Sequence, residues 1–222
     1  MSKWPFEPLV FSEKSLPDMQ QAAHDFYRQI RQRRTVREFS DRPVPRSIIE
    51  DALKAAGTAP SGANMQPWHF VVIANPELKS KIRLAAELEE KEFYEHRASE
   101  EWLRALEPLG TNDSKPFLET APWLIAVFLK KFSYDEHGKR LKNYYTAESV
   151  GISCGFLLAA LHWAGLVTLT HTPSPMKFLN SLLGRPKDER PYMLIVAGYP
   201  QADAEVPVIG KEALDKIVTF KE

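Results

Sequence analysis

The chain has 222 residues, which is enough for one sizeable domain with its own hydrophobic core. Its 29 basic residues balance its 29 acidic residues, and a net charge of zero argues against a dedicated nucleic-acid-binding protein. With 44% hydrophobic and 26% charged residues, the composition excludes a mainly disordered chain. The single cysteine, Cys154, excludes an internal disulfide and a cysteine metal cluster, and it fits a reducing, cytoplasmic location.

In chain order, the hydrophobic pattern predicts long helices between short apolar strands. Residues 1–18 contain three prolines and are expected to form an extended arm, and Asp18 is expected to cap the first helix. The predicted helices cover residues 18–32, 46–57, 76–106, 144–164 and 176–183. The predicted strands cover residues 68–73, 123–129, 166–170 and 192–198, and a last strand can form at 216–220. This order indicates an α/β or α+β fold built around one central sheet.

One segment without charged residues, 149–176, is long enough to cross a membrane. Gly151, His162 and Gly165 interrupt it, however, and the residues after Gly165 have the pattern of a strand. We therefore expect a buried helix–strand unit here. The start of the chain has no apolar core flanked by basic residues, so we expect neither a signal peptide nor a membrane anchor.

Familiar nucleotide-binding and hydrolase motifs are missing from the sequence. No stretch matches the G-x-G-x-x-G fingerprint of dinucleotide-binding domains. Gly57 and Gly62 have the spacing of a phosphate-binding loop, but Ala63 follows where that loop needs a lysine. Any cofactor site must therefore use other residues.

A cluster of basic residues follows the first predicted helix and includes Arg31, Arg33, Arg34 and Arg37. Cations are favourable near the C-terminal end of a helix, so the cluster can be an ordinary solvated helix end. A guanidinium group is also a planar fork of donors that matches phosphate oxygens, and Thr35 adds a hydroxyl. The cluster alone leaves both interpretations open.

Two further segments could contact a ligand. In the turn-rich segment 60–68, a Pro-Ser-Gly sequence exposes backbone N–H groups and the hydroxyl of Ser61. Thr168, Thr170 and Thr172 alternate along a predicted strand and its extension, so their hydroxyls share one face. An ordinary tight loop and the β-propensity of threonine would explain the same patterns.

Taken together and in this order, these segments resemble the nitroreductase family of flavoproteins. Glu90, Tyr94 and Lys115 make the chain similar, within that family, to the reductive dehalogenases of halogenated tyrosines. The resemblance runs from about Phe26 to about Leu214. The matching stretches are RRTVREF, AGTAPSGANMQPWHFVV, TAP at 120–122, CGFLLAALHWAGLVTLTHTP, LLGRP at 182–186 and GYP at 198–200. It implies a single α+β domain over residues 1–222, with a central mixed sheet flanked by helices, in an intertwined homodimer.

The resemblance also implies an FMN cofactor at the dimer interface, with both subunits contributing to each site. The implied FMN-binding residues are Arg33, Arg34, Thr35, Arg37, Ser61, Gly62, Thr170, Thr172 and Lys211. Thr172 would have the catalytic role, because its hydroxyl would donate to flavin N5. A donor at N5 stabilises electron density that arrives there, and in these dehalogenases such a donor is linked to one-electron chemistry.

The implied reaction converts mono- and diiodotyrosine to tyrosine and iodide. An amino-acid substrate carries an ammonium and a carboxylate, and the family pattern assigns these groups to Glu90 and Lys115. Tyr94 would lie beside the substrate ring, and it shares a helix face with Glu90 four residues earlier. Residues 87–118 would close over the substrate as a lid. The backbone N–H of Ala63 would stabilise the substrate phenolate, which an ortho halogen makes easier to form.

Two positions depart from the pattern expected of this group. The strand end reads Thr-His-Thr where three threonines are expected, and we expect His171 to point away from the ligand. The basic residue expected near the carboxyl end is best matched by Lys211.

Two other functions remain open from the sequence. The first is a general NAD(P)H-dependent nitroreductase that acts on other aromatic compounds, and the second is a flavin-binding protein without turnover. In the dehalogenase interpretation, the reductant is NAD(P)H or another donor.

Overall fold

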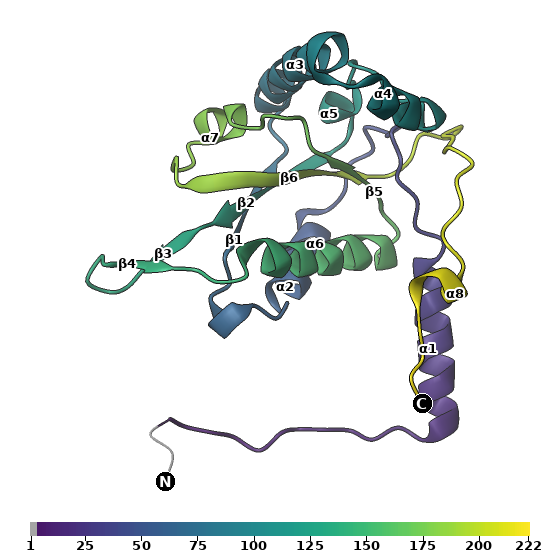
Figure 1. Cartoon of the computed structure of the whole chain (residues 1–222), viewed down its shortest axis with the longest axis vertical. Coiled ribbons are helices and arrows are strands. Elements are labelled where there is room, and N and C mark those ends of the chain that lie inside the picture. Colours follow the sequence, from purple (N-terminus) through teal and green to yellow (C-terminus); the bar gives the residue numbers. More distant parts are fainter. Residues whose placement is uncertain (1–3) are drawn as a thin grey trace. The chain divides into compact units, whose positions relative to one another are not determined.

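We analysed a computed structural model of the chain, which describes residues 4–222 (Figure 1). Contacts divide the chain into two compact units, with the boundary between Arg33 and Arg34. Both units are described below, each by itself.

The first unit contains an extended segment followed by helix α1 (Leu16–Ile30). The expected cap was wrong by three residues, because the side chain of Ser15 caps the helix and accepts a hydrogen bond from the Asp18 backbone N–H. Pro17 and Asp18 lie instead in the first turn, where a proline needs no hydrogen-bond partner and a carboxylate is favourable. No residue of α1 is buried within the described part of the chain.

The second unit is built around a four-stranded sheet in the order β1-β2-β6-β5. The strands are β1 (Trp68–Ile73), β2 (Trp123–Lys130), β5 (Val167–His171) and β6 (Glu189–Gly198). All three strand pairs are antiparallel, so the mixed sheet that the resemblance implied is not found among the described strands; the parallel bridge between Thr35 and Thr168 is isolated. A separate hairpin of β3 (Phe132–Tyr134) and β4 (Arg140–Lys142) extends from the end of β2.

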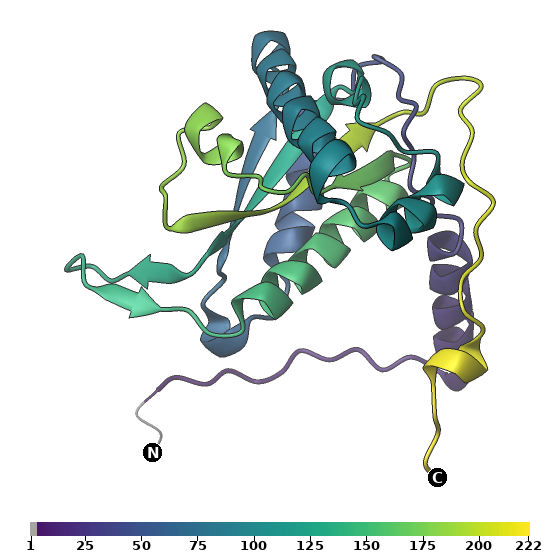
Figure 2. The ribbon, with the colours of Figure 1, turned by 45° about the horizontal axis from the view of Figure 1, so that its top comes forward.

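Helices cover both faces of the sheet (Figure 1; Figure 2). One face carries α2 (Arg46–Gly57) and α6 (Thr146–Trp163). The other face carries α3 (Pro76–Glu92), α5 (Phe117–Thr120) and α7 (Phe178–Leu182). The remaining helices are α4 (Glu100–Leu106) and α8 (Leu214–Ile217).

The two cores follow from the alternation of side chains along β2. Ile125, Val127 and Leu129 pack with α2 and α6, whereas Leu124, Ala126 and Phe128 pack with α3, α5 and α7. Because both faces of the strand are buried, its sequence WLIAVFL is a continuous apolar run. The α+β fold expected from the sequence is thus confirmed.

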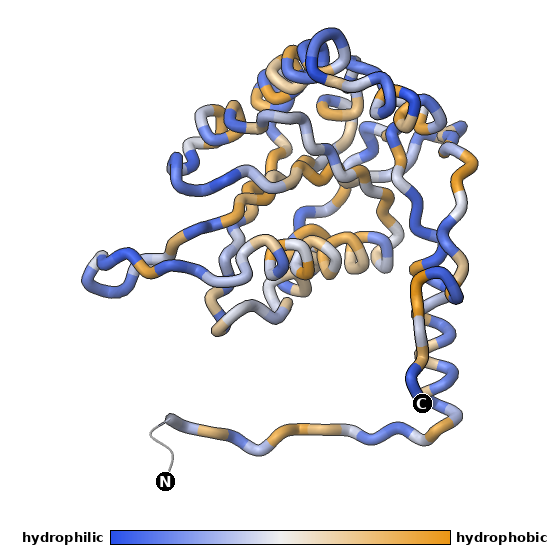
Figure 3. Tube along the Cα trace, in the orientation of Figure 1, coloured by the Kyte–Doolittle hydropathy of each residue, from blue (hydrophilic) through white to orange (hydrophobic). Residues whose placement is uncertain are grey.

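Helix α6 is apolar around most of its circumference (Figure 3). Its inner side includes Cys154, which is 2% exposed and packs in the core. Its outer side leaves Ile152, Phe156 and Trp163 exposed. Among the described residues, no helix is long and apolar enough to cross a membrane.

Two predicted elements were wrong. The single helix expected over residues 76–106 is interrupted: α3 ends at Glu92, a turn of π-helix follows over Phe93–Arg97, and the side chain of Ser99 caps the separate helix α4. The last strand considered at residues 216–220 does not form, since Leu214–Ile217 make a single helical turn. Within residues 4–222, no strand pairs with this exposed tail, and an isolated strand leaves its backbone groups unsatisfied.

Candidate active site

A cavity of about 260 Å³ lies between the end of β5 and the segment that joins α3 to α5. It contains six of the residues proposed from the sequence: Arg37, Glu90, Tyr94, Lys115, Thr170 and Thr172. Phe93, Trp102, Thr111, Phe117 and His171 complete much of the wall. Residues from four separate parts of the chain therefore meet at one place.

The charged centre of this cavity is an ion pair between Glu90 and Lys115. The Lys115 Nζ atom lies 3.2 Å from Glu90 Oε2, and the two side chains are only 4% and 13% exposed, lysine first. Lys115 also donates to the Thr111 hydroxyl at 3.3 Å and to the Asn112 carbonyl. Opposite charges at this depth form a ready site for a ligand that carries both an ammonium and a carboxylate.

Aromatic side chains form the wall beside this pair. The Tyr94 ring lies with its centroid 5.7 Å from Lys115 Nζ, and Phe93 makes edge contacts with both Tyr94 and Trp102 at 5.4 and 4.9 Å. Burial raises the pKa of the Tyr94 phenol, and the negative charge of Glu90 raises it further. Tyr94 is therefore a neutral hydrogen-bonding group near pH 7.

Strand β5 supplies the opposite wall. Thr170 is exposed at its end whereas His171, one residue later on the other side of the strand, is buried against Phe117 at a ring distance of 5.8 Å. The His171 Nε2 atom is buried without a hydrogen-bond partner among the described residues. Burial, assisted by the positive charges of Lys115 and Arg37, lowers the pKa of His171 to about 3, so the imidazole is neutral.

The arginine-rich segment lies alongside the same strand. The backbone N–H of Val36 donates to the Thr168 carbonyl at 3.2 Å, which fixes Thr35 and Arg37 next to β5. Arg37 lines the first cavity and also a second one of about 430 Å³, which Thr35 and Pro207 share. The Arg34 guanidinium donates to the Pro207 carbonyl. Burial lowers the pKa of Arg37, which shows a cation held partly out of water.

The Ser61–Ala63 turn lies elsewhere in the chain, against the start of α6. The Gly62 N–H faces the Ser149 hydroxyl at 3.4 Å, and a Cβ atom at Gly62 would lie 2.9 Å from the Tyr145 ring. Ala63 has a φ of 49°, and Asn64 and Gln66 also have positive φ values. Such strained backbone is costly for residues other than glycine and often marks a functional loop.

Four further predicted residues also lie outside the 260 Å³ cavity. Lys211 is exposed in the tail, Thr35 lines only the second cavity, Arg34 donates a hydrogen bond to Pro207, and Arg33 belongs to the first unit. A larger cavity of about 580 Å³ near β6 and α7 contains none of the predicted site residues.

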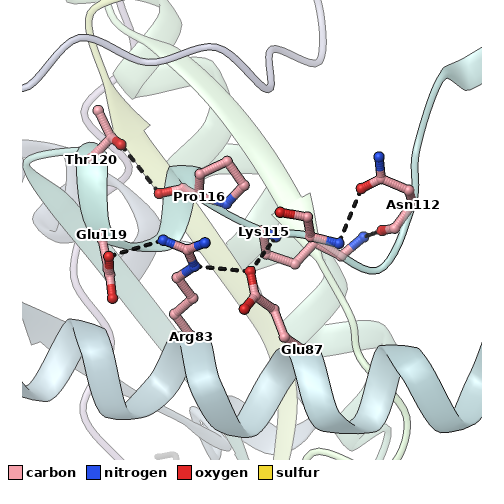
Figure 4. Close-up of polar contacts among 8 residues, drawn as sticks. Arg83, Glu87, Asn112, Lys115, Pro116, Glu119 and Thr120 are labelled. Carbon is pink, nitrogen blue, oxygen red and sulfur yellow. Dashed lines mark hydrogen bonds and ion pairs between the residues drawn. The ribbon is translucent and has the colours of Figure 1, made fainter.

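Sequence reasoning missed several residues of the site. His171 was expected to point away, and it does lie on the opposite side of the strand from Thr170, but it still lines the cavity. The sequence predicts no role for Glu87 beyond its place at the start of segment 87–118, yet its carboxylate accepts the backbone N–H of Lys115 at 2.6 Å (Figure 4). No local pattern could reveal this contact, because 28 residues separate the two partners.

The fold and a match to a protein-family model define the class of protein. The chain belongs to the nitroreductase family, whose model matches residues 30–199.

The relatives point to one group within this family. An iodotyrosine deiodinase of Haliscomenobacter hydrossis is 53% identical over 202 residues, which cover 91% of each chain. The iodotyrosine deiodinase 1 of Mus musculus is 44% identical over 217 residues, covering 96% of this chain and 75% of the mouse protein. A crystal structure of oxidized iodotyrosine deiodinase bound to FMN and 3-iodo-L-tyrosine is similar in fold, with a TM-score of 0.74 and 33% identity. That match covers 88% of this chain and all of the other.

Proposed function

We propose that the chain is an FMN-dependent reductive dehalogenase that converts mono- and diiodotyrosine to tyrosine and iodide. The observation that carries this function is the buried Glu90–Lys115 pair beside Tyr94, Thr170 and Thr172 in one cavity. The pair is complementary to the zwitterion of an amino acid. The deiodinases to which the chain is similar support the same substrate.

The donor set of the cavity fits FMN. Arg37 is a partly desolvated cation that lines both cavities, and such a group favours an anionic or electron-rich ligand. Thr170 and Thr172 add hydroxyl donors at the end of β5. We assign Arg33, Arg34, Thr35, Arg37 and Lys211 to the phosphate and the ring carbonyls, and Ser61, Gly62, Thr170 and Thr172 to the ring. The Thr172 hydroxyl would donate to flavin N5.

Bound FMN supplies two electrons, which with one proton replace the carbon–iodine bond by a carbon–hydrogen bond and release iodide. The residues of the chain would place the substrate for this step. Glu90 would hold the ammonium and Lys115 the carboxylate, so the ion pair seen between them would open around the zwitterion. The segment 87–118 would act as the lid, and its aromatic residues would exclude water from the ring.

We propose that the active form is a homodimer. Helix α6 leaves Ile152, Phe156 and Trp163 exposed, and a helix that is apolar all round is normally covered. The Ser61–Ala63 turn lies against the same helix and outside the chain's own cavity. A second copy packed on α6 would provide this turn, with the Ala63 N–H for the phenolate oxygen.

The reductant and the location are further parts of the proposal. A reductant of the NAD(P)H type fits the family, and the single cysteine supports a cytoplasmic location.

Titration of the bound flavin fluorescence tests the function. The purified protein should be yellow, and iodotyrosine should quench its flavin at concentrations far below those needed for tyrosine. Anaerobic reduction in the presence of iodotyrosine should then release iodide. A colourless protein that takes up no FMN, or equal affinity for the two amino acids, would contradict the proposal.

A further inference from the structure

The Glu87 carboxylate makes contacts that the proposed reaction does not use directly. Its Oε1 atom accepts the backbone N–H of Lys115 at 2.6 Å and the Arg83 Nε–H at 2.8 Å (Figure 4). Glu87 is 25% exposed, so much of it is shielded from water. One oxygen thus connects helix α3 to the backbone of a cavity residue that is 28 positions away.

Two acids on the same side of α3 contact different atoms of Lys115. Glu87 and Glu90 are three residues apart and therefore neighbours on the helix surface. Glu87 accepts from the backbone of Lys115, while Glu90 pairs with its ammonium group. Helix α3 therefore holds both the backbone and the side chain of Lys115 in place.

Arg83 fixes this arrangement from the other side. Arg83 lies one turn before Glu87, and its Nη1 atom donates to the Glu119 carboxylate of α5 at 3.0 Å. In Figure 4 the Arg83 side chain lies between the two carboxylates, with Lys115 beyond Glu87. The chain of contacts therefore runs from α5 through Arg83 and Glu87 to Lys115.

The position of these contacts along the chain gives them a role. Residues 88–114 include the last turn of α3, continue beyond its end at Glu92, form part of the cavity wall and return at Lys115. The bond between Glu87 and Lys115 joins the two ends of this segment, so less conformational entropy remains to be lost when the segment orders over a ligand.

We propose that Glu87, held by Arg83, is a positioning residue that ties the two ends of the lid segment together and thereby sets Lys115 beside Glu90. It acts through Lys115 and does not contact the substrate. The inference rests on the proposed function, because it assigns Glu87 to the binding of the iodotyrosine zwitterion.

The test measures iodotyrosine binding and single-turnover deiodination in FMN-loaded variants. Replacing Glu87 by alanine should raise the Kd for 3-iodotyrosine roughly tenfold, the size expected for the loss of one charge-assisted hydrogen bond. The Kd of Glu87→Gln should lie between those of the wild-type protein and Glu87→Ala. An amide oxygen still accepts the Lys115 N–H, but it carries no charge for Arg83. The rate at saturating iodotyrosine should stay within about twofold of the wild-type rate, because the lost contact stabilises the ground state and the transition state equally.

Two matched controls sharpen the result. Glu77→Gln removes an exposed acid of the same helix outside the lid segment and should leave the Kd unchanged. The Kd for 2-iodophenol, which lacks the ammonium and the carboxylate, should be the same in the wild-type protein and in Glu87→Ala.

Several outcomes would overturn the inference. If the wild-type protein binds iodotyrosine and the Kd of Glu87→Ala equals that of the Glu77→Gln control, Glu87 has no such role and the proposed function stays intact. An equal loss of 2-iodophenol binding would show a general effect on the cavity. Loss of FMN in Glu87→Ala together with a normal Kd in Glu87→Gln would show a role in folding alone. Only a wild-type protein that does not bind iodotyrosine would overturn the proposed function as well.

Discussion

Lys115 Nζ and Glu90 Oε2 lie 3.2 Å apart in a part of the cavity where both side chains are nearly inaccessible to water. Removal of one partner from a buried pair of this kind is strongly destabilising, because the other charge stays buried without an opposite charge. The same two groups are the ones that we assign to the ends of the substrate zwitterion. Their separation in sequence is 25 residues, so the fold of the intervening segment determines whether the pair exists.

Removal of either partner should weaken substrate binding selectively. We expect Glu90→Gln and Lys115→Ala each to raise the Kd for 3-iodotyrosine by at least about tenfold, because a buried charge-assisted contact is lost. FMN should stay bound in both variants, since neither residue is assigned to it. Titration of the flavin fluorescence measures the first quantity and the flavin absorbance of the purified protein measures the second. Unchanged affinity in both variants would contradict the assignment of Glu90 and Lys115 to the substrate zwitterion.

The Thr172 hydroxyl should tune the electron affinity of the flavin. We expect Thr172→Ala to shift the two one-electron reduction potentials toward a single two-electron step, by roughly 60 mV for the loss of one hydrogen bond. Thr172→Ser keeps a hydroxyl at the same position and should restore the separation of the potentials. A redox titration followed by absorbance makes this comparison. Identical potentials in the alanine variant and the wild-type protein would count against a donor at N5.

The outer face of α6 should control assembly. Phe156 is 42% exposed on this helix, and we expect Phe156→Asp to convert a dimer into a monomer because a buried carboxylate at an apolar interface is unfavourable. The monomer should also bind FMN more weakly, since each proposed site needs the Ser61–Ala63 turn of the second copy. Leu84→Asp, an exposed leucine on α3, is the matched control and should remain dimeric. Size-exclusion chromatography with light scattering distinguishes the outcomes.

His171 should make the fold sensitive to acid. Its pKa of about 3 in the folded chain lies below the ordinary value of 6.5, so at intermediate pH the unfolded chain binds a proton that the folded chain does not. The contribution of this histidine is complete above pH 6.5 and decreases as the pH falls toward 3. The loss by pH 5 should be about 2 kcal/mol in the free energy of unfolding. Urea unfolding of the wild-type protein and of His171→Phe at pH 7 and pH 5 should give a smaller loss for the variant, and equal losses would contradict the assignment.

The regular elements of the second unit could be predicted because their signals are local. A few residues are enough to predict each element: the apolar run of β2, the apolar stripe of α2, and the Pro after Asn75 at the start of α3. The break after α3 could not be predicted in the same way. The charged sequence continues with helix-forming residues, and only the Ser99 cap marks a new start.

The candidate site could be predicted in part for a related reason. Glu90 and Tyr94 lie on one side of the lid segment as their spacing indicates, and the structure brings Lys115 to them. The role of Glu87 and the burial of His171 depend on contacts between distant segments, which no spacing encodes. The positive φ values after Gly62 could not be predicted either, because alanine, asparagine and glutamine do not indicate a positive φ as glycine does.

The sole thiol of the chain provides an internal reporter of opening. Burial raises the pKa of Cys154 to about 11, so almost no thiolate is present at neutral pH to react with a thiol reagent. The side chain also lies in the core between α6 and the sheet, where a reagent can reach it only when that core opens. The rate of its modification therefore measures how often the folded protein opens, and any ligand that binds the closed form will slow that rate without a label being introduced.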